Sequence, residues 1–383
     1  MLTDENQQYL TMFKIGITGQ SGFLGSHLYN TIALYPDKFI RIPFKDDFFQ
    51  DISIFNEFVS QCDVIVHLAA VNRHNDPEII YNTNIDLVKR LIESLDQTGH
   101  NPHIIFSSSI QEDFDTPYGR SKREGREILA NWCHKKGSIF TGLIFPNIFG
   151  SFGNPYYNSF IATFCHQLTH SETPKIDADK KILLIYVAEA VKIIIDAILE
   201  RDVNKEYRIV QTSDNYVSDI LNVLNNYKSF YFEKGIFPEL NDEFEHNLFN
   251  TFRSYINLKQ HNPVKLILNN DERGSFIEAI KTNIGGQLSF STTKPGITRG
   301  NHFHTRKIER FTVIKGKSRI QLRRIGTEEI LDFYLSGDEP SYIDMPIWYT
   351  HNITNIGDED LYTLFWVDEF FDKEDTDTYF EEV

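Results

Sequence analysis

The chain has 383 residues, of which 41% are hydrophobic and 24% charged, and its 38 basic and 54 acidic side chains leave a formal net charge of -16. This length is too great for one ordinary hydrophobic core and predicts two or three domains. Such an acidic surface repels nucleic acid and anionic lipid, so a phosphate-bearing ligand must be captured at a local site. We therefore predict a globular protein with no nucleic-acid or membrane partner.

Three further features indicate a cytoplasmic location. Residues 1–11 are polar and acidic, which predicts an N-terminal extension and not a signal peptide. The most apolar stretch, 182–199, is interrupted by charged residues and predicts a buried helix. The three cysteines, Cys62, Cys133 and Cys165, are odd in number and widely spaced, as expected for reduced thiols.

From Met12 to about residue 255, short apolar runs alternate with helical stretches. The apolar runs lie at 13–17, 39–42, 64–68, 104–106 and 141–145. Strands that alternate with helices form parallel sheets with right-handed crossovers. We predict an α/β, Rossmann-like, doubly wound parallel sheet over residues 12–258.

The pattern changes at about Val264, where strand-like runs follow one another at short spacing. Examples are 287–291, 310–314 and 319–323, separated by Gly and Pro turns. This pattern predicts a small antiparallel barrel or sandwich. We therefore predict an all-β domain over 262–383, with a hinge at Asn262-Pro263.

Three glycines spaced by three residues, Gly19, Gly22 and Gly25, lie after the first predicted strand and before a helix. Glycines let the backbone turn tightly and approach a pyrophosphate, and the following helix offers its N–H groups to the same phosphates. A glycine turn also occurs for packing alone, but its place in the chain favours a dinucleotide site.

A predicted acid–base set follows downstream. Tyr118 and Lys122 are four residues apart, which places them on one face of a helix, and the serines 107–109 precede them at a strand end. A free tyrosine titrates near pH ~10, and a neighbouring ammonium lowers its pKa. A serine hydroxyl can orient a substrate carbonyl, so the set suits carbonyl reduction.

With these motifs the sequence resembles the extended short-chain dehydrogenase/reductase family, many of whose members act on nucleotide sugars. The resemblance implies that Ser109 is the catalytic hydroxyl, with Ser108 as the second candidate. It also implies that Asn147 and Asn158 contact the substrate. The cofactor contacts it implies are Gly19, Gly22, Phe23, Leu24, Gly25, Asp51, Ile52, Leu68, Ala69, Ala70, Asn84, Tyr118 and Lys122.

The choice between NAD and NADP is made near the end of the second strand, where an acidic side chain selects NAD. Here Lys45 would attract a 2′-phosphate, whereas Asp46 or Asp47 could repel it. We favour NADP.

A second chemistry is indicated near the C-terminus. His302 and His304, at i and i+2 on a predicted strand, point to the same side of a sheet. Glu309 after a short turn and His351 from another strand could complete a ligand set. Imidazole and carboxylate ligands without thiolate suit Zn, Mn, Fe or Ni.

The segment Gly296-x5-His302-x-His304-x4-Glu309-x6-Gly316 resembles the first motif of the cupin superfamily, and Pro346-x4-His351-x3-Asn355 resembles the second, with Trp348 at its usual glycine. This resemblance implies a double-stranded β-helix barrel whose ligands are His302, His304, Glu309 and His351. The segment 271–278 resembles the opening of deoxysugar epimerases of that superfamily, some of which use a histidine base without metal.

The combination resembles the bacterial CapF family of capsular polysaccharide synthesis, including the segments 158–164, 350–352 and 377–383. That resemblance implies a UDP-linked 4-keto-6-deoxy-hexosamine substrate, NADPH, Zn²⁺ and a homodimer. It implies C3 epimerisation in the cupin and C4 reduction to UDP-2-acetamido-2,6-dideoxy-L-talose, on the way to UDP-L-FucNAc. The base is open, and Lys294, Arg299 and Tyr349 are candidates by proximity.

Three alternatives remain open at this level. The cupin could be a structural or dimerising module beside a single-function NAD(P)-dependent UDP-sugar reductase. It could be an Fe dioxygenase, or the protein could be a nucleotide-sugar sensor, although Ser109, Tyr118 and Lys122 argue against a sensor. We predict the bifunctional enzyme.

Overall fold

The computed structural model describes residues 12–201, 204–271, 274–277, 279–282, 286–369 and 372–383. The predicted extension 1–11 lies outside the described residues, as does part of the segment 271–278. The chain divides into two compact units, one made of the residues up to Phe149 with Lys181–Asn215, the other of Gly150–Lys180 with Tyr216–Val383.

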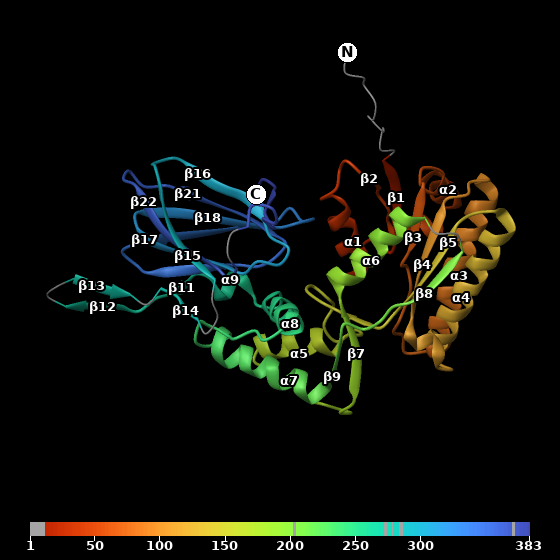
Figure 1. Cartoon of the computed structure of the whole chain (residues 1–383), viewed down its shortest axis with the longest axis horizontal. Coiled ribbons are helices and arrows are strands. Elements are labelled where there is room, and N and C mark those ends of the chain that lie inside the picture. Colours follow the sequence, from red (N-terminus) through yellow and green to blue (C-terminus); the bar gives the residue numbers. More distant parts are fainter. Residues whose placement is uncertain (1–11, 202–203, 272–273, 278, 283–285, 370–371) are drawn as a thin grey trace, which may run out of the picture. The chain divides into compact units, whose positions relative to one another are not determined.

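The first unit is built on a six-stranded parallel sheet of order β2-β1-β3-β4-β5-β8 (Figure 1). Its strands are β1 (Phe13–Thr18), β2 (Phe39–Ile42), β3 (Val64–His67), β4 (His103–Ser109), β5 (Phe140–Phe145) and β8 (Lys205–Arg208). A three-stranded sheet is formed by β6 (Asn147–Phe149), β7 (Lys181–Tyr186) and β9 (Ser213–Tyr216).

Helices cover both faces of the six-stranded sheet. The helices α1 (Phe23–Ile32) and α6 (Val187–Glu200) pack together on one face, and α2 (Ile52–Ser60), α3 (Pro77–Thr98) and α4 (Pro117–Lys136) lie on the other (Figure 1). Val64 and Val66 belong to one hydrophobic core and Ile65 to the other, because successive side chains of a strand point to opposite faces. The predicted doubly wound fold is confirmed.

The second unit contains two five-stranded antiparallel sheets of order β11-β20-β17-β22-β15 and β19-β18-β21-β16-β23. Between them lies a core that includes Val313, Ile320, Ile343 and Ile353. The predicted all-β domain is thus confirmed. The strands are β11 (Val264–Lys265), β15 (Gln287–Thr293), β16 (Thr298–Phe303), β17 (Glu309–Lys315), β18 (Lys317–Arg324), β19 (Ile330–Ser336), β20 (Ser341–Met345), β21 (Tyr349–Asn355), β22 (Leu361–Val367) and β23 (Tyr379–Phe380).

Helices from the middle of the chain complete the second unit. They are α5 (Phe160–Thr169), α7 (Val217–Asn226), the π-helix η3 (Tyr227–Phe232), α8 (Glu243–Arg253) and α9 (Leu258–His261). Short pairs are formed by β10 (Ile236–Phe237) with β14 (Lys281–Thr282) and by β12 (Leu268–Asp271) with β13 (Gly274–Ile277).

Buried polar contacts join these helices to the barrel. The guanidinium of Arg310 donates to Asp344 at 2.7 and 3.0 Å and to the carbonyl of Gly235 at 3.0 Å. Tyr231 donates to the same Asp344 carboxylate, and Arg253 donates to the Met345 carbonyl at 2.9 Å. The domain boundary predicted near residue 260 therefore lies inside the second unit.

Among the described residues, no helix combines the length and apolar character that a membrane span requires.

Candidate functional site

The glycine turn has the geometry that a dinucleotide phosphate site requires. Gly19 has a φ of +71°, and a Cβ there would lie 2.8 Å from the Ala69 nitrogen. A Cβ at Gly25 would lie 2.1 Å from the Gly19 carbonyl oxygen, so a side chain is excluded at both positions. Gly22 is the N-cap of α1 and provides no side-chain cap, which leaves the N–H groups of the first turn for a phosphate.

The ends of β1 and β3 are tied together beside this turn. Leu68 N–H donates to the Thr18 carbonyl at 3.2 Å, and Ala69 N–H lies 3.4 Å from the Thr18 hydroxyl. The predicted contacts Leu68 and Ala69 thus lie next to the glycine turn. Buried Asn84 bonds to both backbone groups of Val71 at 2.7 and 2.9 Å and to the Ser121 hydroxyl at 3.0 Å, so it holds the loop after β3 to helix α4.

One acidic residue bonds to the glycine turn. Asp46, at the start of the 3₁₀ helix η1 (Asp46–Gln50), accepts a 2.9 Å hydrogen bond from the Ser21 hydroxyl. Lys45, the predicted phosphate contact, is exposed. Asp51 caps α2 by accepting from the N–H groups of Ser53 and Ile54, a structural role beside its predicted cofactor contact.

Helix α4 carries the predicted acid–base pair. Thr116 caps its N-terminus, Pro117 is its first residue, and Gly137 ends it in the left-handed conformation. Lys122 is buried, and its Nζ donates to the Ser107 carbonyl at 2.7 Å and lies 5.9 Å from the centre of the Tyr118 ring. Burial lowers the pKa of Lys122 to about 8, against the opposing field of the Glu112 carboxylate.

The two candidate serines differ in their contacts. Ser108 is buried and donates to the carboxylate of Glu112. Ser109 is half-buried and accepts the Gln111 N–H at 3.2 Å, so its O–H can donate to a substrate oxygen. This geometry favours Ser109 as the substrate-orienting hydroxyl.

The two predicted substrate contacts lie in different units. Asn147, in β6 of the first unit, donates to the Leu183 carbonyl at 3.2 Å. Asn158 is exposed and belongs to the second unit.

The four predicted metal ligands form one cluster in the second unit. Ligand atoms of His302, His304, Glu309 and His351 lie within 4.8 Å of one another. His302 pairs directly with His351 across β16 and β21, whereas Glu309 begins β17 in the facing sheet. The carboxylate of Glu309 lies 2.9 Å from His304 Nε2 and 3.3 Å from His351 Nε2.

This donor set fits a divalent metal ion. Three imidazoles and one carboxylate are ligands that Zn²⁺ and similar ions accept. The buried Nε2 of His351, although 3.3 Å from the Glu309 carboxylate, meets no group in the described part of the chain with hydrogen-bond geometry, as expected for a metal-binding atom. Burial, assisted by the neighbouring imidazoles, lowers the pKa of His302 to about 4, so this ring is neutral and able to ligate.

The C-terminal segment supports the cluster. The carbonyl of Asp377 lies 2.5 Å from His304 Nδ1, which directs Nε2 of that ring toward Glu309. The Asp377 carboxylate accepts N–H groups from Thr305, Arg306 and Lys307, and β23 pairs with β16. Sequence reasoning gave Asp377 no role, although it opens the closing segment 377–383.

The structure separates the candidate bases. Lys294 follows Thr293, which pairs with Leu361 at one end of β22. Glu309 pairs with Val367 at the other end of β22, so Lys294 lies at the barrel end opposite to Glu309. Tyr349 is half-buried on β21, two residues before His351, and burial raises its pKa. Arg299 is exposed and lies on β16, the strand of His302.

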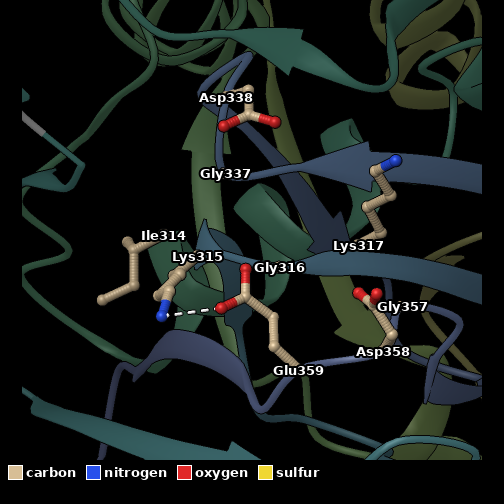
Figure 2. A pocket seen from close by; sticks show the side chains of 9 residues that line it. All are labelled: Ile314, Lys315, Gly316, Lys317, Gly337, Asp338, Gly357, Asp358 and Glu359. Carbon is tan, nitrogen blue, oxygen red and sulfur yellow. Dashed lines mark ion pairs between the residues drawn. The ribbon is translucent and has the colours of Figure 1, made fainter.

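A polar hollow of about 180 Å³ lies on the turns after β17, β19 and β21, at the same far end of the barrel (Figure 2). It contains the ion pair of Lys315 with Glu359 at 2.8 Å. None of the four ligands lines it. Its lining residues are Ile314, Lys315, Gly316, Lys317, Gly337, Asp338, Gly357, Asp358 and Glu359.

A parallel sheet with a glycine turn, a serine at a strand end and a Tyr–Lys helix define a short-chain dehydrogenase/reductase. Comparisons with known proteins agree with this class. Residues 15–211 match the NAD dependent epimerase/dehydratase family, and residues 269–379 match the polysaccharide biosynthesis C-terminal domain. The chain belongs to the NAD dependent epimerase/dehydratase family and is of the CapF type.

Individual relatives support this assignment. A UDP-2-acetamido-2,6-beta-L-arabino-hexul-4-ose reductase of Pseudomonas aeruginosa is 30% identical over 374 residues, which are 96% of this chain and 98% of that protein. The capsular polysaccharide assembling protein CapF of Staphylococcus aureus is 34% identical, with a TM-score of 0.58 and coverage of 97% and 100%. RMD of P. aeruginosa, solved with NADPH, is 16% identical, with a TM-score of 0.51 and coverage of 57% and 83%, and shares the fold.

Proposed function

We propose that this chain is a bifunctional nucleotide-sugar enzyme of capsular or surface polysaccharide synthesis. The barrel inverts C3 of a UDP-4-keto-6-deoxy-hexosamine, and the first unit reduces C4 to give UDP-2-acetamido-2,6-dideoxy-L-talose. One observation carries the proposal: a single chain holds a Ser–Tyr–Lys set and a separate histidine–carboxylate cluster. The relative from P. aeruginosa, named as a hexul-4-ose reductase and matched over nearly its whole length, supports the substrate class.

The chemistry of the sugar sets the order of the two steps. The proton at C3 becomes acidic because C4 is a ketone, and reduction removes that ketone. Epimerisation must therefore precede reduction.

In the reduction, the side chains of the first unit handle the oxygen at C4. Ser109 donates a hydrogen bond to the ketone, and Tyr118 gives the proton that the new hydroxyl needs. Lys122 lies one helical turn from Tyr118 and, as an ammonium, favours proton transfer to the substrate oxygen. The reduced nicotinamide supplies the hydride when it is bound. The glycine turn would hold its pyrophosphate, and Lys45 would contact the 2′-phosphate of NADPH.

In the epimerisation, the four ligands would hold a divalent metal ion, for which we propose Zn²⁺. Such an ion, when bound, supplies a Lewis acid that stabilises charge on the oxygen at C4. Burial raises the pKa of Tyr349 above its ordinary value, so this phenol suits proton donation better than proton removal. We further propose that the enzyme works as a homodimer.

Proton exchange separates the two steps. The protein with a UDP-4-keto-6-deoxy-hexosamine in D2O should exchange one sugar proton before a reductant is added, and NADPH should then consume the ketone. Exchange that survives both metal chelation and His302→Ala would contradict the role of the barrel. NADH is run beside NADPH to test the cofactor.

A further inference from the structure

A short turn connects the predicted catalytic serine to the predicted catalytic helix. The 3₁₀ helix η2 (Ile110–Asp113) begins directly after Ser109 and packs against α4. At Gly119, next to Tyr118, a Cβ would lie 2.3 Å from the Gln111 carbonyl and 2.5 Å from the Phe114 carbonyl. The helix thus approaches the turn as closely as the backbone allows, so the conformation of η2 sets the separation of Ser109 and Tyr118.

Glu112 holds this turn in place from inside the protein. Its side chain is 6% exposed and accepts from Arg126 twice, at 2.9 and 3.1 Å. The same carboxylate accepts from the hydroxyl of Ser108, and the Glu112 carbonyl accepts from Arg123 at 3.0 Å. One residue therefore joins the end of β4 to two successive turns of α4.

The charge of Glu112 also acts on the buried Lys122. Burial disfavours the ammonium form and lowers the pKa of Lys122 to about 8, whereas the Glu112 carboxylate favours the ammonium.

Within the described residues, the other groups around Lys122 do not carry a negative charge that could replace that of Glu112. From β4 it meets the Ser107 carbonyl and the Phe106 ring, and from its own helix the Tyr118 ring. His67 of β3 is neutral, because burial lowers its pKa to about 3. Between α3 and α4, Glu78 pairs with Arg120, and Glu124 accepts from Tyr81.

We propose that Glu112 is a positioning residue of the reductase: it fixes Ser108 and Ser109 against helix α4 and places a negative charge near the buried Lys122. This inference rests on the proposed reduction.

The test is Glu112→Gln, which keeps the shape of the side chain and removes its charge. We expect kcat for ketone reduction to fall about tenfold or more, with KM for NADPH within about twofold of the wild-type value. The high-pH limb of kcat should move to lower pH by about half a unit or more, because Lys122 loses its proton sooner. Glu206→Gln is the matched control, since Glu206 pairs with the same Arg126 but is exposed.

Glu112→Asp separates charge from shape. The high-pH limb of kcat should stay at the wild-type position because the charge is kept. The value of kcat should fall, because the shorter side chain cannot reach both Ser108 and Arg126. A wild-type kcat and pH limb in Glu112→Gln, or the same changes in Glu206→Gln, would overturn the proposal. If Glu112→Gln does not fold, Glu112→Asp decides, and an unchanged kcat in that variant refutes the positioning role.

A titration without turnover keeps this inference distinct from the proposed function. The Cε signal of Lys122, assigned with Lys122→Arg, should titrate at lower pH in Glu112→Gln than in the wild type. Equal titration would refute the charge role even if the substrate proposal failed.

Discussion

The Lys122 ammonium donates a 2.7 Å hydrogen bond to the carbonyl of Ser107, so the helix of the predicted Tyr–Lys pair is anchored at the strand end that carries the candidate serines. This contact joins β4 to α4 in the first unit. Because Lys122 is buried, water stabilises its ammonium form only weakly. Burial and the neighbouring Glu112 carboxylate therefore set its pKa.

Replacement of the predicted proton donor should abolish reduction. Tyr118→Phe removes the hydroxyl and should lower kcat by about 10²–10⁴-fold, while dinucleotide binding, measured by fluorescence titration, stays near the wild-type value. Tyr81→Phe, which removes a hydroxyl bonded to Glu124 on the same helix, should reduce the ketone at close to the normal rate. Normal reduction by Tyr118→Phe would exclude Tyr118 as the donor.

Reduction should decline as pH rises through about 8. Below that value Lys122 is an ammonium, and above it the neutral amine no longer favours proton transfer from Tyr118. A kcat–pH profile of the wild type measures this limb. A profile that stays flat to pH ~10, the range of a free lysine, would show that Lys122 is not the controlling group.

Loss of a cluster histidine should remove metal without affecting the first unit. His351→Ala should lower the bound metal, measured by elemental analysis, to a small fraction of the wild-type content, because one of four ligands is lost. C3 exchange in D2O should be lost with it, while reduction of a ketone already inverted at C3 continues. His166→Ala, a histidine of the same unit outside the cluster, is the control. Full metal content in His351→Ala would contradict the ligand assignment.

The C-terminal support of His304 should affect metal affinity. Asp377→Ala removes the carboxylate that caps the N–H groups of residues 305–307 and should weaken metal binding about 10–100-fold, as measured by chelator competition. Asp358→Ala, an exposed acid on a turn at the opposite end of the barrel, should have no effect. Equal affinities in the two variants would show that the Asp377 carboxylate does not support the site.

Two neighbouring residues should act oppositely on cofactor choice. Lys45→Ala should raise KM for NADPH about tenfold and leave KM for NADH nearly unchanged, because a phosphate contact is lost. Asp46→Ala removes the carboxylate bonded to Ser21 and should favour NADPH further. Steady-state kinetics with both cofactors measure the ratio, and an unchanged ratio in Lys45→Ala would remove Lys45 from the cofactor site.

Local patterns predicted the fold class well. Gly19 and Gly25 are required because a Cβ at either position would overlap backbone atoms, so the glycine spacing predicts the turn directly. The histidine–carboxylate cluster was also predictable, because i and i+2 positions share a face of a strand. The pairing of His302 with His351 across β16 and β21 brings the third histidine to the other two.

Residues whose role depends on distant neighbours were missed. Glu112 and Asp377 resemble ordinary surface acids in the sequence, and their partners lie up to 73 positions away. The strand–helix pattern predicts the helices of 216–261 as part of the first domain, yet Tyr231 and Arg253 bond to Asp344 and Met345 of the barrel.

The sequence by itself determined the two folds and allowed both sites to be predicted, because backbone geometry and side-chain periodicity act over a few residues. Only the tertiary structure decided which serine bonds to Glu112, which unit the middle helices join, and what surrounds Lys122 and His304. Those facts depend on burial and on hydrogen bonds between segments far apart in the chain, which local spacing does not encode.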